Sequence, residues 1–237
     1  TEVPDSLGAG EWGALRGEDV AGQFYDFLCP HGFTAPTETL ERFMAGNDIA
    51  ALARADPLTA VRALSGRLYR ALEYEPGVTR ADSPIDHALE AGRGVCQDFA
   101  QIMIAICRGW GVPARYVSGY LFCDPSVGDR SDPEATHAWV DVFLPSLGWV
   151  GFDPTNDIMA GERHIVVASG RDYGDVPPSR GVYKGDVESE LAVAVSVRKA
   201  GAATVEPQFM RSARPAVSST GRRLPSSAAL DQRLQQQ

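Results

Sequence analysis

The first half of the chain places hydrophobic residues at helical spacing. The segment through Val20 is turn-rich. Further along, a Pro-Thr pair at 36–37 precedes the first predicted helix. Asp56 followed by Pro57 is an N-cap with proline at the first helical position of the next helix. We expect this second helix to end at Gly77. Its apolar residues recur three and four positions apart, as on a face turned to a core: Leu58, Val61, Leu64, Leu68 and Leu72.

Two further helices are predicted before the pattern changes. Ser83 and Pro84 repeat the cap-then-proline signal, so a short helix is expected to lead into the Gly-Arg-Gly turn at 92–94. Residues 95–110 are apolar almost throughout and are closed by glycines at 109 and 111. This stretch predicts a buried central helix.

After Gly111 the hydrophobic period falls to two, which is typical of strands. We expect strands at 114–122, 137–143, 149–153, 165–169 and 191–198. Helices followed by an antiparallel sheet define an α+β fold. The loop from Cys123 to Ala135 is polar, rich in Asp, Gly and Pro, and is expected to be mobile.

Composition excludes several classes of protein. The 237 residues are 44% hydrophobic, enough for a sizeable core, and contain no apolar run of the roughly 18 to 20 residues that a membrane-spanning helix needs. The net charge of −9 argues against a nucleic-acid partner. The four cysteines are too few and too widely spaced for a disulfide scaffold or a zinc finger. We therefore expect free thiols, a cytoplasmic location and no membrane partner.

The ends of the chain differ in character from its middle. The chain begins at Thr1 rather than Met, so we expect residues 1–35 to be a lead-in from something upstream. Residues 36–203 carry the predicted catalytic core. Residues 204–237 are rich in Ser, Pro and Gln, carry five arginines against one aspartate, and are predicted to be disordered.

Cys96 stands apart from the other three cysteines. It lies at the first turn of the predicted central helix, directly after the Gly-Arg-Gly turn, where unpaired N–H groups and the helix dipole stabilise a thiolate. Cys107 lies about 16 Å further along the same helix, and neither Cys29 nor Cys123 is next to a helix start. We assign those three to packing or chance, and Cys96 is the candidate nucleophile.

A nucleophilic cysteine needs a base and a group that orients the base. Among the four histidines, His137 begins a predicted strand, and the next strand ends on Asp153. If the two strands form a hairpin turned at 144–148, the register places Asp153 opposite about residue 139, within reach of the His137 ring. These residues complete a candidate Cys-His-Asp triad.

Each assignment has a structural alternative. A free cysteine is commonly a small buried hydrophobe, a lone histidine at a strand start is commonly a surface or core residue, and an aspartate before proline commonly forms a turn. Three such residues in the order Cys, His, Asp, each at the end of an element, favour the catalytic interpretation.

The sequence resembles the transglutaminase-like superfamily, in its bacterial cysteine-protease-like branch. The likeness runs from about residue 36 to 200 and is strongest in three blocks: Arg93–Ala100, Gly111–Tyr120, and His137–Trp139 followed by Gly148–Thr155. Members of this branch often carry a β-rich domain ahead of the core, and the resemblance implies that this chain begins near the end of such a domain.

The resemblance implies a papain-like α+β core with Cys96 as nucleophile, His137 as general base and acid, and Asp153 as the orienting carboxylate. It implies a thioester acyl-enzyme formed from an amide. No residue matches the tryptophan that serves as oxyanion donor in animal transglutaminases, and no spaced-carboxylate loop predicts calcium activation. We expect no cofactor and no metal.

Several functions remain in competition. The leading hypothesis is a thiol-dependent hydrolase of peptide or isopeptide bonds, with a peptide or protein substrate. The alternatives are transglutaminase activity, in which an amine resolves the thioester, and a non-enzymatic binding module. A metal site at Cys96, Cys123 and His137 is the least favoured. Three aromatic residues are weak candidates for substrate binding: Tyr116, Trp139 and Trp149.

Overall fold

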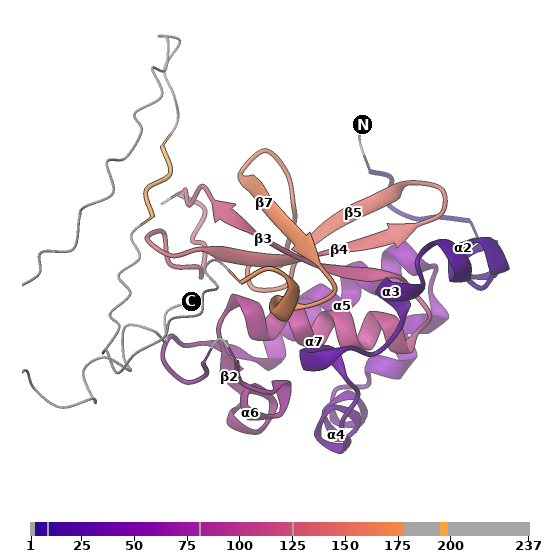
Figure 1. Ribbon diagram of the computed structural model, residues 1–237, viewed down its shortest axis with the longest axis horizontal. Coiled ribbons are helices and arrows are strands. Elements are labelled where there is room, and N and C mark those ends of the chain that lie inside the picture. The colour runs from indigo at the N-terminus through magenta and orange to yellow at the C-terminus, as the bar shows by residue number, and fades with distance from the viewer. Residues whose placement is uncertain (1–2, 9, 81, 125, 178–194, 199–237) are drawn as a thin grey trace, which may run out of the picture.

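The computed structural model describes residues 3–8, 10–80, 82–124, 126–177 and 195–198 (Figure 1). The predicted disordered tail at 204–237 lies outside these residues, as do residues 191–194 of the last predicted strand. Residues 195–198 have no regular secondary structure.

Helices occupy most of the chain before residue 110. The α-helices are α1 (Glu11–Leu15), α2 (Glu18–Gln23), α3 (Tyr25–Leu28), α4 (Glu38–Gly46), α5 (Pro57–Ala71), α6 (Ile85–Ala91) and α7 (Cys96–Gly109). Short 3-10 helices lie at η1 (Gly32–Thr34), η2 (Ile49–Arg54) and η3 (Tyr173–Asp175). The helices predicted from residues 36, 56, 83 and 95 onward are therefore present as α4, α5, α6 and α7.

Strands follow, as the change of period predicts. A five-stranded sheet has the order β6-β5-β4-β3-β7, and all its neighbouring strands are antiparallel. Its strands are β3 (Ala114–Leu121), β4 (His137–Leu144), β5 (Gly148–Asp153), β6 (Ile158–Met159) and β7 (His164–Gly170). A two-residue parallel pair, β1 (Glu73–Tyr74) and β2 (Arg93–Gly94), lies just ahead of α7.

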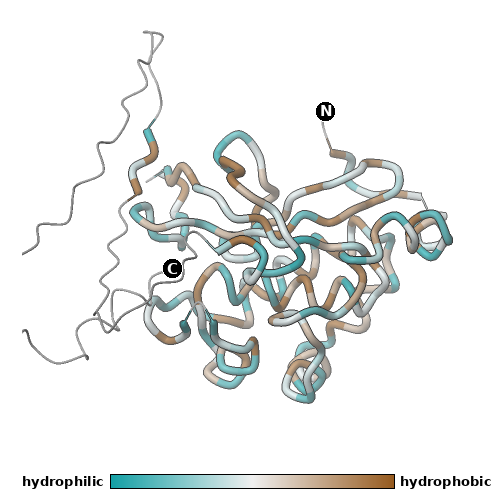
Figure 2. Tube along the Cα trace, in the orientation of Figure 1, coloured by the Kyte–Doolittle hydropathy of each residue, from teal (hydrophilic) through white to brown (hydrophobic). Residues whose placement is uncertain are grey.

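The helices cover one face of the sheet, with α7 directly against β3 and β4 and α5 beside α7 (Figure 1). The hydrophobic core lies between the sheet and these helices. It contains fully buried residues of α5, α7 and β4: Leu58, Leu64, Leu68, Phe99, Ile102, Met103, Ile106, Val140 and Val142. Many of the hydrophobic segments in Figure 2 run along the sheet and the helices beneath it. The predicted α+β class is confirmed.

Two sequence predictions about helix positions in the first hundred residues were wrong. The segment through Val20 is partly helical rather than only turn-rich, because α1 and the first residues of α2 lie there. The second predicted helix ends at Ala71 rather than at Gly77, since Leu72 is extended (φ −120°, ψ 141°) and directs the chain into β1. From β1 on, the backbone makes its hydrogen bonds with the strand before α7, so the helical hydrogen-bond pattern does not continue.

Within the described residues, no helix combines the length and apolar character that a membrane crossing requires.

Candidate active site

Cys96 is the first residue of α7. Contacts of the residues just before it and just after it in the chain fix its position. The β1–β2 pair places Tyr74 opposite Gly94, two residues ahead of the cysteine. Asp98, in the first turn, accepts a hydrogen bond from the Val95 N–H (2.8 Å). Gly94 is required here, since an added Cβ would lie 2.6 Å from the Asp98 carboxylate oxygen.

Asp98 is a buried carboxylate that holds the helix start. Its Oδ2 also accepts a hydrogen bond from the Thr79 hydroxyl (2.5 Å). Burial raises the pKa of Asp98 to about 6, although the hydrogen bonds from Thr79 and Val95 and the charge of His87 oppose the rise. The chain thus stabilises the start of α7 with a carboxylate that titrates near neutral pH.

The β4–β5 hairpin brings His137 and Asp153 together. Val140 pairs with Phe152, so Asp153 falls opposite Trp139, as the hairpin register predicts. His137 Nε2 lies 2.7 Å from Asp153 Oδ2, and both side chains are fully buried.

Asp153 receives hydrogen bonds from five nitrogens. Oδ1 accepts from the backbone N–H groups of Thr155 (3.0 Å) and Asn156 (3.3 Å). Oδ2 faces His137 Nε2, the Asn156 side-chain amide (2.8 Å) and His164 Nε2 (3.2 Å). Burial alone would raise the pKa of Asp153, but the His137 charge and the hydrogen bonds hold it below its usual value. The carboxylate is therefore ionised.

His137 carries the complementary charge. Burial would lower its pKa, but the charge of Asp153 and its hydrogen bond, followed by contact with Cys96, raise that pKa to about 10. Because Nε2 faces Asp153, Nδ1 is the ring nitrogen that can exchange a proton with a nucleophile. Ser131 Oγ lies 3.3 Å from Nδ1 and accepts a hydrogen bond from the Asn156 amide (2.9 Å).

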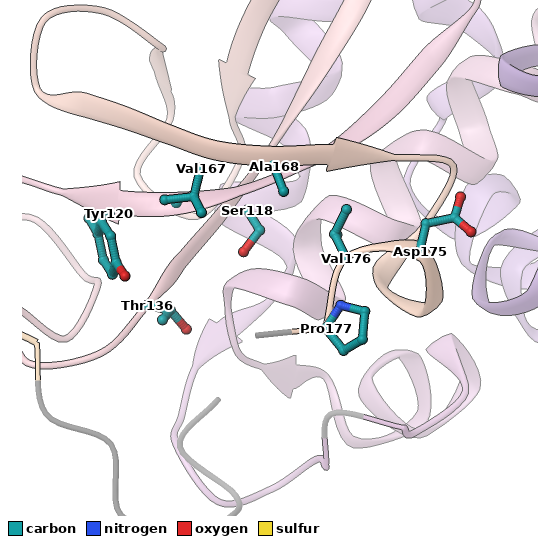
Figure 3. A pocket seen from close by; sticks show the side chains of 9 residues that line it. Ser118, Tyr120, Thr136, Val167, Ala168, Asp175, Val176 and Pro177 are labelled. Atoms are coloured by element: carbon teal, nitrogen blue, oxygen red, sulfur yellow. The ribbon is translucent and has the colours of Figure 1, made fainter. Parts of the chain in front are cut away.

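The Cys96 thiol contacts a residue that lines a cavity. Its Sγ is 4.0 Å from the carbonyl oxygen of Thr136. Thr136 lines a cavity of about 310 Å³ (Figure 3), whose other walls come from β3, β7 and the chain from the last residue of η3 onward: Ser118, Gly119, Tyr120, Val167, Ala168, Asp175, Val176 and Pro177.

The three aromatic residues proposed for substrate binding do not line this cavity. Tyr116 and Trp139 are buried in the interior. Trp149 packs edge-on against Phe24 and Phe27 near the N-terminal helices. None of the three lines the cavity beside Thr136.

Three polar residues that the sequence analysis did not select also belong to this site: Ser131, Asn156 and His164. Ser131 comes from the loop predicted to be mobile, and Asn156 follows the Asp-Pro-Thr turn. His164 had a usable signal, because it lies directly before the strand predicted at 165–169. Among the described residues, the group with metal-compatible geometry is His137, Asp153 and His164, rather than Cys96, Cys123 and His137.

The fold and this geometry define a papain-like arrangement, with a cysteine at a helix start facing a histidine and an aspartate on adjacent strands. Residues 47–154 match the family model of the transglutaminase-like superfamily, so the chain carries a core of that superfamily and the resemblance is confirmed.

Three known proteins illustrate the similarity. Protein Rv2569c of Mycobacterium tuberculosis (strain ATCC 25618 / H37Rv), which is uncharacterized, is 46% identical over 149 residues, covering 60% of this chain and 48% of that protein. A protein-glutamine gamma-glutamyltransferase of Pseudomonas aeruginosa is 31% identical over 118 residues, covering 45% of this chain and 17% of that protein.

The crystal structure of a candidate cysteine protease from Cytophaga hutchinsonii aligns with a TM-score of 0.55 and 26% identity, over 66% of this chain and 50% of that chain. The chain spans about half the length of the mycobacterial relative that it matches.

Proposed function

We propose that this chain catalyses acyl transfer at amide bonds through Cys96, His137 and Asp153, with hydrolysis of peptide or isopeptide bonds as its main reaction. The observation that carries the proposal is the 2.7 Å contact between His137 Nε2 and Asp153. With Nε2 engaged, Nδ1 of a charged imidazole is the nitrogen proposed to exchange a proton with Cys96, which lies at the N-terminus of a buried helix.

The reaction proceeds in two halves. His137 holds the thiol proton while the Cys96 thiolate attacks the amide carbonyl carbon, forming an S–C bond and a tetrahedral oxyanion. The oxyanion collapses, the C–N bond breaks, and His137 gives its proton to the departing amine. Water then attacks the thioester, with His137 accepting the water proton, and the S–C bond breaks to release the acid and restore the thiol.

Two donors are proposed for the oxyanion. One is the backbone N–H of Cys96, in a helical turn whose N–H groups have no carbonyl partner within the helix. The other is the hydroxyl of Tyr74, a residue whose backbone pairs with Gly94 in the β1–β2 pair. Burial, and next the negative charge of Cys96, raise the pKa of Tyr74 well above its usual value. Its hydroxyl therefore keeps the proton that it would donate.

The names of two similar proteins support the two reactions. The candidate cysteine protease supports hydrolysis, and the Pseudomonas aeruginosa protein-glutamine gamma-glutamyltransferase supports transfer to an amine. The cavity beside Thr136 is lined by hydroxyl groups, small apolar side chains and the carboxylate of Asp175, a mixed lining that can hold a peptide segment. Transamidation is the second candidate, because it uses the same thioester.

The decisive experiment incubates the protein with a peptide mixture and a primary amine and identifies the products by mass spectrometry. We expect new peptide termini or deamidated side chains to outnumber amine adducts, and Cys96→Ala to lose both. Cys107→Ser, on the same helix, is the control with retained turnover. If amine adducts outnumbered the hydrolysis products, transamidation would be the main reaction instead of hydrolysis. If the wild type formed neither kind of product, the proposal would be contradicted.

A further inference from the structure

A second histidine, His164, contacts the same carboxylate oxygen as His137. It is the first residue of β7, its side chain is 3% exposed, and its Nε2 lies 3.2 Å from Asp153 Oδ2. His137 and His164 thus approach one oxygen from two strands. A histidine buried against the carboxylate of a candidate triad requires a physical explanation.

The protonation pattern of His164 follows from its other nitrogen. The backbone N–H of Gly161 points at Nδ1 from 3.2 Å, so Nδ1 carries a lone pair. A neutral imidazole has one protonated nitrogen, and the proton therefore lies on Nε2. His164 is consequently a hydrogen-bond donor to Asp153.

The same observation argues against a metal ion bound by His137, Asp153 and His164. A histidine that ligates a metal through Nε2 bears its proton on Nδ1, and that proton would face the Gly161 N–H. The Asn156 amide also points its N–H at Asp153 Oδ2, from 2.8 Å. The N–H groups of Gly161 and Asn156 thus point at the would-be ligands and disfavour a cation. The ligand atoms of the three residues nevertheless lie within 4.8 Å of one another.

The sheet is shaped so that His164 reaches Asp153. In the order β6-β5-β4-β3-β7, two strands separate β5 from β7, which is about 14 Å in a flat sheet. The register of β3 with β7 shifts between Ser118 and Gly119, as in a β-bulge. Gly119 permits this approach, since an added Cβ would collide with the Ile165 carbonyl oxygen and lie 2.8 Å from the Trp139 ring.

Trp139 supports both histidine rings. The His137 ring stacks on the indole at 6.0 Å and 28°, and the His164 ring meets it edge-on at 5.1 Å and 73°. Trp139 is 1% exposed, so its ring is held by packing. The indole therefore restricts both imidazoles, and the Asp153 carboxylate lies where their Nε2 atoms converge.

We propose that His164 is a positioning residue of the triad. Its Nε2–H fixes the Asp153 carboxylate in the orientation that holds His137 Nδ1 toward Cys96. The inference rests on the proposed function for its consequence in catalysis, but not for its geometry. Without this donor, Oδ2 loses one of its three partners and the carboxylate gains freedom to rotate, so His137 is held less firmly against the thiol.

Two substitutions separate donation from packing. His164→Leu fills the space without a donor, whereas His164→Gln offers an amide N–H at a similar reach. His31→Leu is the matched control, because His31 also bonds a buried aspartate, Asp172, at 2.7 Å, but outside this site. We expect His164→Leu to lower the rate of Cys96 alkylation by iodoacetamide about ten-fold. His164→Gln should stay within about three-fold of the wild type, and His31→Leu should alter the melting temperature alone.

A second readout is independent of catalysis. Ring ¹⁵N spectra of the wild type should show His164 protonated at Nε2 and not at Nδ1, and His164→Leu should shift the Nε2–H proton resonance of His137. If Cys96 of the wild type does not react selectively, the proposed function fails, while these spectra still decide the role of His164.

Three results would overturn the inference. One is an unchanged alkylation rate in His164→Leu. Another is an equal loss in His164→Leu and His164→Gln at equal melting temperatures. The third is a His164 protonated at Nδ1 together with stoichiometric binding of added Zn²⁺ that both substitutions abolish, which would make His164 a metal ligand.

Discussion

Individual residues of the site combine full burial with charge. Asp153 and His137 are almost completely buried, and a buried ion pair is tolerated only where hydrogen bonds replace the lost water. Asp153 meets this condition with its five nitrogen neighbours, whereas His137 Nδ1 has Ser131 as its hydrogen-bond partner among the described contacts. The arrangement stabilises the ion pair while leaving one nitrogen for proton transfer.

This electrostatic arrangement predicts how stability depends on pH. Because the folded-state pKa of His137 is raised to about 10, its pairing with Asp153 contributes fully below the ordinary pKa of 6.5 and is lost as pH rises through about 10. The free energy of unfolding of the wild type, relative to His137→Gln, should therefore fall between pH 6.5 and pH 10. The free energy of unfolding should change by about 1.4 kcal/mol for each unit by which folding raises the pKa of His137. Urea denaturation at both pH values measures it, and a constant difference would contradict the charged pair.

Sequence reasoning selected Cys96, His137 and Asp153 because each lies at the end of an element with a strong pattern. Ser131 could not be selected, since nothing local distinguishes a serine in a polar loop. The role of His164 depends on a bulge between β3 and β7, and pairing between strands more than forty residues apart leaves no local pattern.

Elements with strong periodicity or caps were predicted well. Thr37 accepts a hydrogen bond from the Leu40 N–H, and Asp56 accepts one from Thr59, as their sequence contexts indicate. Ser83 differs, because its hydroxyl accepts from the Arg80 N–H instead of capping α6. The two-residue strands β1, β2 and β6 are too short for any period to reveal them.

The close approach of the strands at the β3–β7 bulge predicts that two glycine substitutions differ in their effect on stability. Gly119→Ala should lower the free energy of unfolding by about 1 to 3 kcal/mol, because the new methyl group must displace β7 or Trp139. Gly13→Ala in α1 is the control, since its Cβ would meet nothing within 4 Å and should be neutral or stabilising by up to about 1 kcal/mol. Urea denaturation compares them, and equal stabilities would contradict the close approach of β7.

Across the whole molecule, Arg108 connects the N-terminal helices to the core. Its buried guanidinium donates to the carbonyl oxygens of Phe27 and Cys29 in the lead-in, to Ala114 of β3, and to Arg171 after β7. Burial lowers its pKa to about 10, and the negative charge of Asp172 opposes this. The described part of residues 1–35 is thus bonded to the layer that positions Cys96, a long-range relation that no local pattern encodes.

The cysteines provide the most direct test of the central claim, that Cys96 is an activated nucleophile. Exposure alone predicts that half-buried Cys29 and Cys123 react before buried Cys96 and Cys107. Burial also raises the pKa of Cys123 and raises that of Cys107 to about 12. Brief treatment with iodoacetamide at pH 7, followed by mass spectrometry of the four cysteine peptides, measures each rate.

We predict that Cys96 is alkylated at least about ten-fold faster than Cys29, Cys107 and Cys123, and that His137→Gln removes this advantage. Rates ordered by exposure in the wild type, or an advantage of Cys96 that survives His137→Gln, would contradict the account.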